Sequence, residues 1–367
     1  MRTTAIFTAL LLSLASSAFA VSPAIDIVGT LPATVIVHSN KLTHASMQLA
    51  TAESTANATE VKHILLQHII LSKIAQKNLD NKLNASDTLL NTPETPSVLP
   101  AQIDLGMNGV PILDQGMHGA CATFASTAII DAIYSKGDYI SQLCNLELTD
   151  FLHPNSEVGH EGWEGSTNYL ILSQMQLYGV ISKTYQQEYG CGGLKDYPLA
   201  ERENIGLPLS SDDFLLHSEK LMVSMSTKTL LNIDEAFKSN RKAAFKGIKQ
   251  ALLNGHRVAI GILTDHNTGS VGAFGWYKTA NDSWILTPDI KKNIKAHKID
   301  SGHAVIITAY DDNAFIKGPD QTLHKGVFTL RNSWGTGAGN HGEYYMSYHY
   351  FKTLGIEAIE VLPTPEA

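Results

Sequence analysis

The sequence predicts an α+β protein whose main domain has a helical half followed by a β half. Apolar stretches with helical periodicity and no Gly or Pro come first along this domain. Short runs rich in β-branched and aromatic residues dominate the last third of the chain. Segregation of helices and strands along a chain is typical of α+β domains. The expected helices span residues 121–134, 168–178 and 243–253, and the expected strands span residues 258–263, 304–310, 327–331 and 343–348.

Length and composition restrict the class of protein. The chain has 367 residues, 44% of them hydrophobic, which is enough for a sizeable core. A formal net charge of −8 without any Lys/Arg run argues against a nucleic-acid partner. Three cysteines are too few for a disulfide scaffold. The pair His160-Glu161 lacks the second histidine of a zinc-protease motif, so we expect neither a metal nor a cofactor.

The first twenty residues have the order of a secretory signal peptide. Arg2 precedes an apolar stretch over residues 5–15, and small residues lead to Ala20. The apolar stretch is short for a membrane span, and no second one follows. We therefore expect a secreted protein, extracellular or periplasmic, without a membrane span once the signal is removed. An uncleaved anchor is the alternative.

Residues 21–98 differ from the rest of the chain. Two β-rich runs, 25–28 and 34–37, flank a five-residue turn and predict a β-hairpin. Apolar residues at helical spacing predict an amphipathic helix over residues 61–79. The composition of residues 84–96 is that of a linker. So short a segment buries little apolar surface alone, so we expect it to lie on the larger domain, residues 99–367.

Three distant residues carry the chemistry. Cys121 opens the first predicted helix, where unpaired N–H groups stabilise a thiolate. His303 stands at the start of one predicted strand and Asn332 at the end of the next, so antiparallel pairing makes them neighbours. An Asn carbonyl can then orient the imidazole. Gln115, on the loop before the helix, can join the Cys121 N–H in an oxyanion hole. A buried structural cysteine and a structural histidine remain the alternatives for each position alone.

At these residues the sequence resembles the papain-like cysteine peptidases. The matching stretches are Asp114-Gln-Gly-x-x-Gly-Ala-Cys-Ala-Thr-Phe-Ala125, Gly302-His-Ala-Val305 and Asn332-Ser-Trp-Gly-Thr336. The resemblance spans about residues 99–350 and implies a helical lobe and a β-barrel-like lobe with the active site between them. It also implies that Trp334 covers the His303–Asn332 hydrogen bond and takes part in substrate binding. The ledge that binds substrate is expected at Gly165 and Ser166 or, alternatively, near Gly162.

The sequence departs from the family at several points. Ala122 replaces the aromatic residue after the nucleophile, His118 replaces a cysteine, and Ala338 replaces a second tryptophan. The other two cysteines, Cys144 and Cys191, flank the second predicted helix near the place where the family often has a disulfide. A bridge between them would contribute about 4 kcal/mol in the chain-entropy model. Two free buried thiols are the alternative.

The leading hypothesis is a secreted cysteine endopeptidase that is made as a zymogen. Its partners would be peptide or protein substrates and its own propeptide, residues 21–98, which acts as an intramolecular inhibitor until the linker is cut. A folding chaperone or an adhesive arm is the alternative role for this segment. A transamidase on the same fold, or a secreted binding protein that has kept the fold, is the alternative for the whole chain; Ala122 and Ala338 motivate the binding protein.

Overall fold

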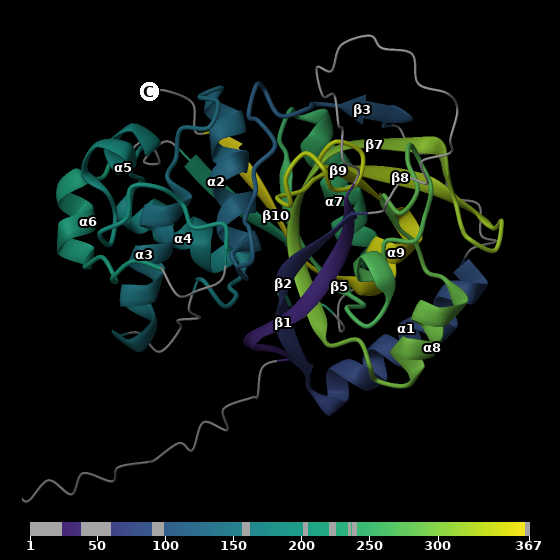
Figure 1. Ribbon diagram of the computed structural model, residues 1–367. Helices are drawn as coiled ribbons and strands as arrows, with labels where there is room; N and C mark the ends of the chain where they lie inside the picture. Colours follow the sequence, from purple (N-terminus) through teal and green to yellow (C-terminus); the bar gives the residue numbers. More distant parts are fainter. Residues whose placement is uncertain are drawn as a thin grey trace, which may run out of the picture.

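The chain folds into a helical lobe and a sheet lobe, with an N-terminal segment lying against both (Figure 1). The computed structural model describes residues 24–37, 60–89, 99–155, 162–200, 205–219, 225–233, 236 and 241–363. The predicted signal peptide lies outside these residues, as does the linker beyond Leu89. The α+β prediction is confirmed, because helices and one large sheet occupy different parts of the molecule.

The helical lobe is built around α2. This helix begins at Cys121 and ends at Tyr134, as predicted, and its residues are buried from Cys121 to Ala132. Burial on all sides makes α2 the axis of the lobe. The helix predicted over 168–178 is α4, with the same bounds. The helices of this lobe are α2 (Cys121–Tyr134), α3 (Gln142–Leu152), η1 (His153–Asn155), α4 (Asn168–Tyr178), α5 (Lys183–Tyr189) and α6 (Ser211–His217).

The sheet lobe contains a path of strands in the order β4-β10-β5-β7-β8-β9-β6. The last pair, β6 and β9, is parallel, whereas the others are antiparallel. The four predicted strands are all present, and β7 is much longer than its prediction. The elements are β3 (Gln102–Asp104), β4 (Met225–Leu231), α7 (Arg241–Leu253), β5 (Val258–Thr264), η5 (Gly269–Gly272), β6 (Ser283–Trp284), α8 (Pro288–Lys295), β7 (Ser301–Lys317), β8 (Leu323–Arg331), β9 (Glu343–Ser347), α9 (Tyr348–Leu354) and β10 (Gly355–Pro363).

The N-terminal segment contains a β-hairpin, but not the predicted one. A single strand, β1 (Ile25–Val37), runs through the expected turn at 29–33 and pairs with β2 (Glu60–Leu71). The register of the pairing shifts between Ile27 and Gly29, where a β-bulge interrupts the ladder. Pro32 is tolerated because β1 is an edge strand. The hairpin connection lies outside the described residues.

The helix predicted over 61–79 is wrong in its first half. Residues 60–71 form β2, because they pair with β1 on one edge and with β7 on the other. The helix α1 (Lys73–Leu89) begins only after Ser72, whose hydroxyl accepts a hydrogen bond from Ala75 N. The helix also continues through residues 84–89, where the sequence predicts a linker. Tertiary pairing overrides the local periodicity here.

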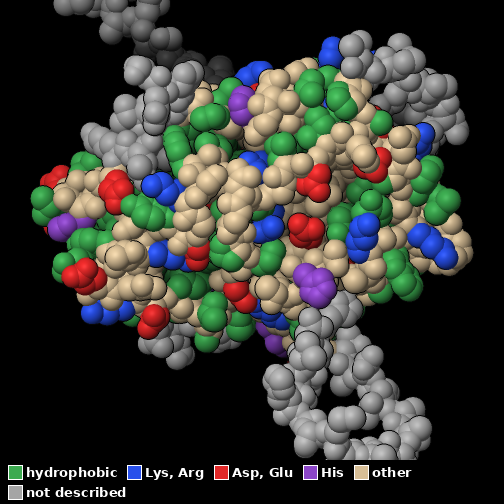
Figure 2. All heavy atoms as spheres, turned by 90° about the horizontal axis from the view of Figure 1, so that it is seen from above, with side chains coloured by type: hydrophobic (Ala, Val, Ile, Leu, Met, Phe, Trp, Pro, Cys, Tyr) green, Lys and Arg blue, Asp and Glu red, His purple; other side chains and the backbone are tan. Residues whose placement is uncertain are grey.

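The surface has no strong charge polarity on the face that Figure 2 shows, where acidic and basic side chains are interspersed. Within the described part of the chain, no helix has both the length and the apolar character that a membrane span requires.

Candidate active site

Cys121 is the first residue of α2. Its neighbour Ala120 provides no side-chain cap, so the first-turn N–H groups lack a capping side chain. The backbone N–H of Ala304, in the sheet lobe, donates to the Cys121 sulfur at 3.4 Å. The cysteine is only 1% exposed. Burial raises the pKa of this thiol from 9.0 to about 11, and hydrogen bonds from backbone N–H groups oppose the shift.

His303 and Asn332 are neighbours, as their strand positions predict. Residues Ile306 and Arg331 pair between β7 and β8, which sets His303 beside the residue that follows β8. A hydrogen bond of 2.8 Å joins His303 Nε2 to Asn332 Oδ1. The other ring nitrogen, Nδ1, is buried and has no hydrogen-bond partner among the described residues. Burial lowers the pKa of His303 from 6.5 to about 4, although the bond to Asn332 acts in the opposite direction.

Trp334 covers this pair. Its ring stacks on the His303 imidazole, with the ring centroids 4.3 Å apart and the planes 22° from parallel. Trp334 is itself 1% exposed. The indole therefore shields the His303–Asn332 hydrogen bond from water, which strengthens it electrostatically.

Gln115 lies beside the site and links the two lobes. Its backbone N–H donates to Ser333 O at 2.8 Å, and its side-chain oxygen accepts from the Ser333 hydroxyl at 2.7 Å. Its side-chain nitrogen donates to His118 O at 2.8 Å. Because the amide is fully buried and held at both ends, its direction is fixed. His118, where the family has a cysteine, packs instead against the rings of Trp163 and Tyr197.

The predicted ledge, Gly165 and Ser166, is occupied by the N-terminal hairpin. Gly165 has φ +126°, a conformation that favours glycine. A methyl group at this position would lie 2.9 Å from Ile27 of β1. Ser166 O accepts a hydrogen bond from the side-chain nitrogen of Gln67, in β2. The sequence predicts that this segment lies on the larger domain as an inhibitor, but it does not indicate which hairpin side chains make the contacts, because no local pattern encodes them.

The cysteines divide into a pair and a single thiol. Cys144, in α3, and Cys191, just after α5, form a disulfide, and Cys121 is free. The described residues contain no group of three or more His, Cys, Asp or Glu side chains placed to hold a metal ion.

Comparison with known proteins places the chain in a family. Residues 99–364 match the family described as papain family cysteine protease. Among solved structures, xylellain from Xylella fastidiosa is similar at 17% identity and TM-score 0.46, over 76% of this chain and 93% of that chain. Procathepsin L 3 of Tenebrio molitor larval midgut is 16% identical with TM-score 0.43, over 82% of this chain and 83% of the other.

The ragweed pollen allergen Amb a 11, in its proform, is also similar, at 15% identity and TM-score 0.41 over 78% of this chain and 75% of that one. No curated protein matches the sequence. The family match extends over most of the chain and includes Cys121, His303 and Asn332. The chain therefore belongs to the papain family of cysteine proteases.

Proposed function

We propose that the chain is the precursor of a secreted cysteine endopeptidase, with Cys121, His303 and Asn332 as its catalytic triad. The observation that carries this proposal is the convergence of three distant segments. The Cys121 sulfur lies against the backbone of Ala304, next to a histidine whose ring is held by Asn332. A nucleophile, a base and a group that orients the base are the requirements of covalent acyl transfer.

The tautomer of His303 follows from its partners. Asn332 Oδ1 can only accept, so His303 Nε2 carries the proton and Nδ1 is free to accept one. Asn332 Oδ1 also accepts from the Ser333 N–H at 2.7 Å, which fixes the amide. Once Nδ1 takes the Cys121 proton, the thiolate attacks the substrate carbonyl carbon and forms a C–S bond. The imidazolium then gives the proton to the leaving amine as the C–N bond breaks.

The oxyanion of the tetrahedral intermediate needs two donors. The Cys121 N–H at the start of α2 is one, and the buried amide of Gln115 is the other. The ties from Gln115 to Ser333 hold this amide in place before substrate arrives. Water, deprotonated by His303, then attacks the thioester, and the acid product and the free thiol are released.

We infer further that the N-terminal segment, residues 21–98, holds the enzyme inactive. Three glycines around the site leave space that the hairpin fills. A methyl group on Gly119 would lie 2.5 Å from a Thr30 carbon, and one on Gly302 would lie 2.3 Å from an Ile69 carbon. A substrate cannot occupy the same volume, so the hairpin and a substrate exclude each other.

Polar contacts hold the hairpin in this position. Lys62 forms a salt bridge with Asp114 and also donates to Trp334 O at 3.0 Å. Gln67 donates to Ser166 O and pairs with Gly302 across the β2–β7 ladder. The strand β2 takes the edge of β7 that β8 leaves free beyond Ile306. This is strand addition directly beside His303.

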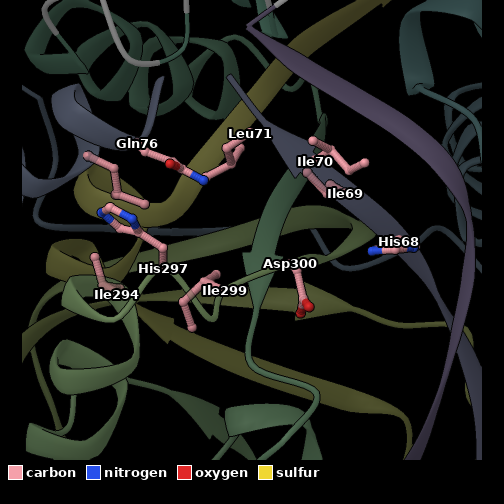
Figure 3. Close-up of a pocket in the computed structure, with 10 residues that line it drawn as sticks. His68, Ile69, Ile70, Leu71, Gln76, Ile294, His297, Ile299 and Asp300 are labelled. Atoms are coloured by element: carbon pink, nitrogen blue, oxygen red, sulfur yellow. The ribbon is translucent and has the colours of Figure 1, made fainter. Parts of the chain in front are cut away.

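The interface between the N-terminal segment and the sheet lobe, which we call the seam, is incompletely packed. A cavity of about 170 Å³ lies between β2, α1 and the sheet lobe, and Figure 3 shows the side chains that line it. Two His–Asp pairs flank this seam: His297 with Asp80 of α1 at 3.1 Å, and His266 with Asp300 at 2.9 Å. An unfilled seam with polar pairs suits an interface that later separates, because empty space forfeits packing contacts.

Secretion completes the proposal. The signal-like first twenty residues and the Cys144–Cys191 disulfide both suit an oxidising compartment. An enzyme exported with its site covered does not act on its host before its linker is cut.

The test uses the full chain with a recognition site for a sequence-specific protease placed within residues 90–98. Hydrolysis of internally quenched peptides is measured before cleavage and after the segment is separated. We expect only residual activity before cleavage, a large increase after it, and no activity at either stage in the matched Cys121→Ala chain. Equal rates before and after cleavage would remove the inhibitory role. A cleaved chain that is inert, and whose Cys121 ignores a thiol-directed epoxide, would favour the binding protein instead.

A further inference from the structure

A buried carboxylate ties the two lobes together beside the ledge. Glu357, on β10 of the sheet lobe, is 4% exposed. One of its oxygens accepts hydrogen bonds from the Asn168 backbone N–H at 3.0 Å and from the Asn168 side chain at 2.8 Å. The other oxygen accepts from the Tyr169 N–H at 3.1 Å. These donors belong to the first two residues of α4, in the helical lobe.

The fold makes room for this contact. Glu357 is paired with Gly261 of β5, and Gly261 is paired with Ala304 of β7, so the three form a row across the sheet. A methyl group on Gly261 would lie 3.3 Å from Glu357 Cβ, which is tighter than ordinary contact. The row ends at the residue whose N–H meets the Cys121 sulfur. Glu357 therefore reaches α4 from two strands away from Ala304, in the same row of the sheet.

The partners of Glu357 are all donors. Helix N-termini carry unpaired N–H groups and a partial positive charge, which favour a carboxylate. Burial raises the pKa of the Glu357 carboxyl, and the three donors act against that shift. Within the described part of the chain, no Lys or Arg forms an ion pair with it. The helix end itself thus supplies the counter-charge.

A buried negative charge near Cys121 disfavours the thiolate, because it raises the pKa of the thiol. The charge of Glu357 therefore does not itself help catalysis by this thiol. Any benefit of the Glu357 carboxylate must come from the way in which it positions α4. Asn168 is two residues after Ser166, a distance of at most about 7 Å along the chain, and Thr167 between them caps α4 through its hydroxyl. Whatever fixes the start of α4 also fixes the ledge.

We propose that Glu357 is a positioning residue: its carboxylate fixes the N-terminus of α4 against the sheet lobe and so holds Ser166 where it binds the backbone of a peptide substrate. The inference rests on the proposed function, because it assigns Ser166 the role of a substrate contact. In the precursor, the side-chain nitrogen of Gln67 donates a hydrogen bond to Ser166 O in place of the substrate.

The test measures the hydrolysis of two substrates by the cleaved enzyme. Both substrates carry the same leaving group. One is an acylated tripeptide amide, long enough to reach Ser166, and the other is a single acylated amino acid amide. In Glu357→Gln, the new NH₂ group faces one of the N–H donors, so half of the contact is lost. We expect KM for the tripeptide to rise about tenfold with kcat within twofold, and kinetics on the short substrate to stay unchanged.

The matched control is Glu360→Gln. Glu360 lies on the same strand and is 3% exposed, but it pairs with His256 at 2.8 Å, within the sheet lobe. This variant should leave both substrates unaffected. Asn168→Ala removes one of the three donors and leaves the backbone donors in place, so it should produce a smaller rise in the same KM. This second variant keeps the proposal testable if Glu357→Gln does not fold.

Hydrogen exchange gives a readout that does not depend on activity. The amides of residues 166–169 should exchange at least tenfold faster in Glu357→Gln than in the wild type or in Glu360→Gln. An equal loss of kcat/KM for both substrates, or an unchanged exchange rate of the amides of residues 166–169, would overturn the positioning role. A wild-type enzyme that hydrolyses neither substrate would instead overturn the proposed function, and the exchange result would still decide whether Glu357 holds the ledge.

Discussion

The reactivity of Cys121 toward an alkylating reagent should change sharply when the N-terminal segment is removed. In the closed chain, burial raises the pKa of this thiol from 9.0 to about 11. At pH 7 the thiolate, which is the reactive form, then falls from about 1% of the thiol to about 0.01%. The difference corresponds to about 2.7 kcal/mol. We therefore expect iodoacetamide to react at least 100-fold more slowly with the closed chain than with a small thiol.

Removal of the segment should reverse both pKa shifts. Water then reaches Cys121 and His303, so burial no longer disfavours their charged forms. A thiol at a helix N-terminus beside an imidazolium has a pKa below the ordinary value. The rate for the opened enzyme should therefore stay high down to about pH 6, whereas the rate for the closed chain should still rise above pH 9.

The label reports on Cys121 alone, because the other two cysteines form the disulfide. Label incorporation is followed by intact mass between pH 5 and pH 10, in the uncleaved chain and in the cleaved and separated enzyme. The Cys121→Ala chain should take up no label. The reasoning is refuted if the closed chain reacts as fast as a small thiol, or if the two pH profiles coincide.

Four further predictions concern the hairpin, the pH dependence of its binding, the proposed triad and the disulfide. Gln67→Ala removes one hydrogen bond that holds the hairpin, so the uncleaved chain should gain roughly tenfold in peptide hydrolysis, at about 1.4 kcal/mol; a rate no different from wild type would contradict it. His303 has a pKa near 4 in the closed chain and 6.5 ordinarily, so the open state takes up a proton as the pH falls. Size exclusion of the cleaved complex should therefore show about 60-fold weaker binding of the segment at pH 4.5 than at pH 7. Asn332→Ala should lower kcat by about 10- to 100-fold, because the imidazole loses its orienting bond at 2.8 Å, while the circular dichroism spectrum stays unchanged. A Cys144→Ser, Cys191→Ser double variant should lose about 4 kcal/mol in the free energy of unfolding by urea, and a loss below 1 kcal/mol would show that the bridge constrains little.

The positions of the candidate site residues in the fold were predictable because each lies at the end of a local element. Cys121 is placed by the start of one uninterrupted apolar helix, and that helix has the predicted bounds. His303 and Asn332 are placed by the start of one strand and the end of the next, and a simple antiparallel register brings them together. Each placement follows from the bounds of a local element and from the pairing of two strands that are adjacent in sequence.

The N-terminal segment was not predictable in the same way. The run Ile64-Leu-Leu-Gln-His-Ile-Ile-Leu71 fits a helical period and a strand period about equally well. Its strand conformation depends on β1 and on the free edge of β7, which lies more than 230 residues further along the chain. Likewise, Gly29 and Pro32 indicated a turn, yet an edge strand with one bulge accommodates both. Glu357 carried no signal either, because its partners are 188 and 189 residues away.

These distant contacts explain how the proposed triad, divided between two lobes, can keep its geometry. Cys121 belongs to the helical lobe, whereas His303 belongs to the sheet lobe, and a displacement of about 1 Å at such a site can reduce the rate 100-fold. Polar ties that cross the boundary include Gln115 to Ser333 beside the proposed oxyanion hole, and Glu357 to the start of α4 beside the ledge. The hairpin adds a further connection, which the proposed precursor loses on activation. The proposed enzyme can therefore lose its N-terminal segment without losing the alignment of its lobes, because the other ties belong to residues 99–367 themselves.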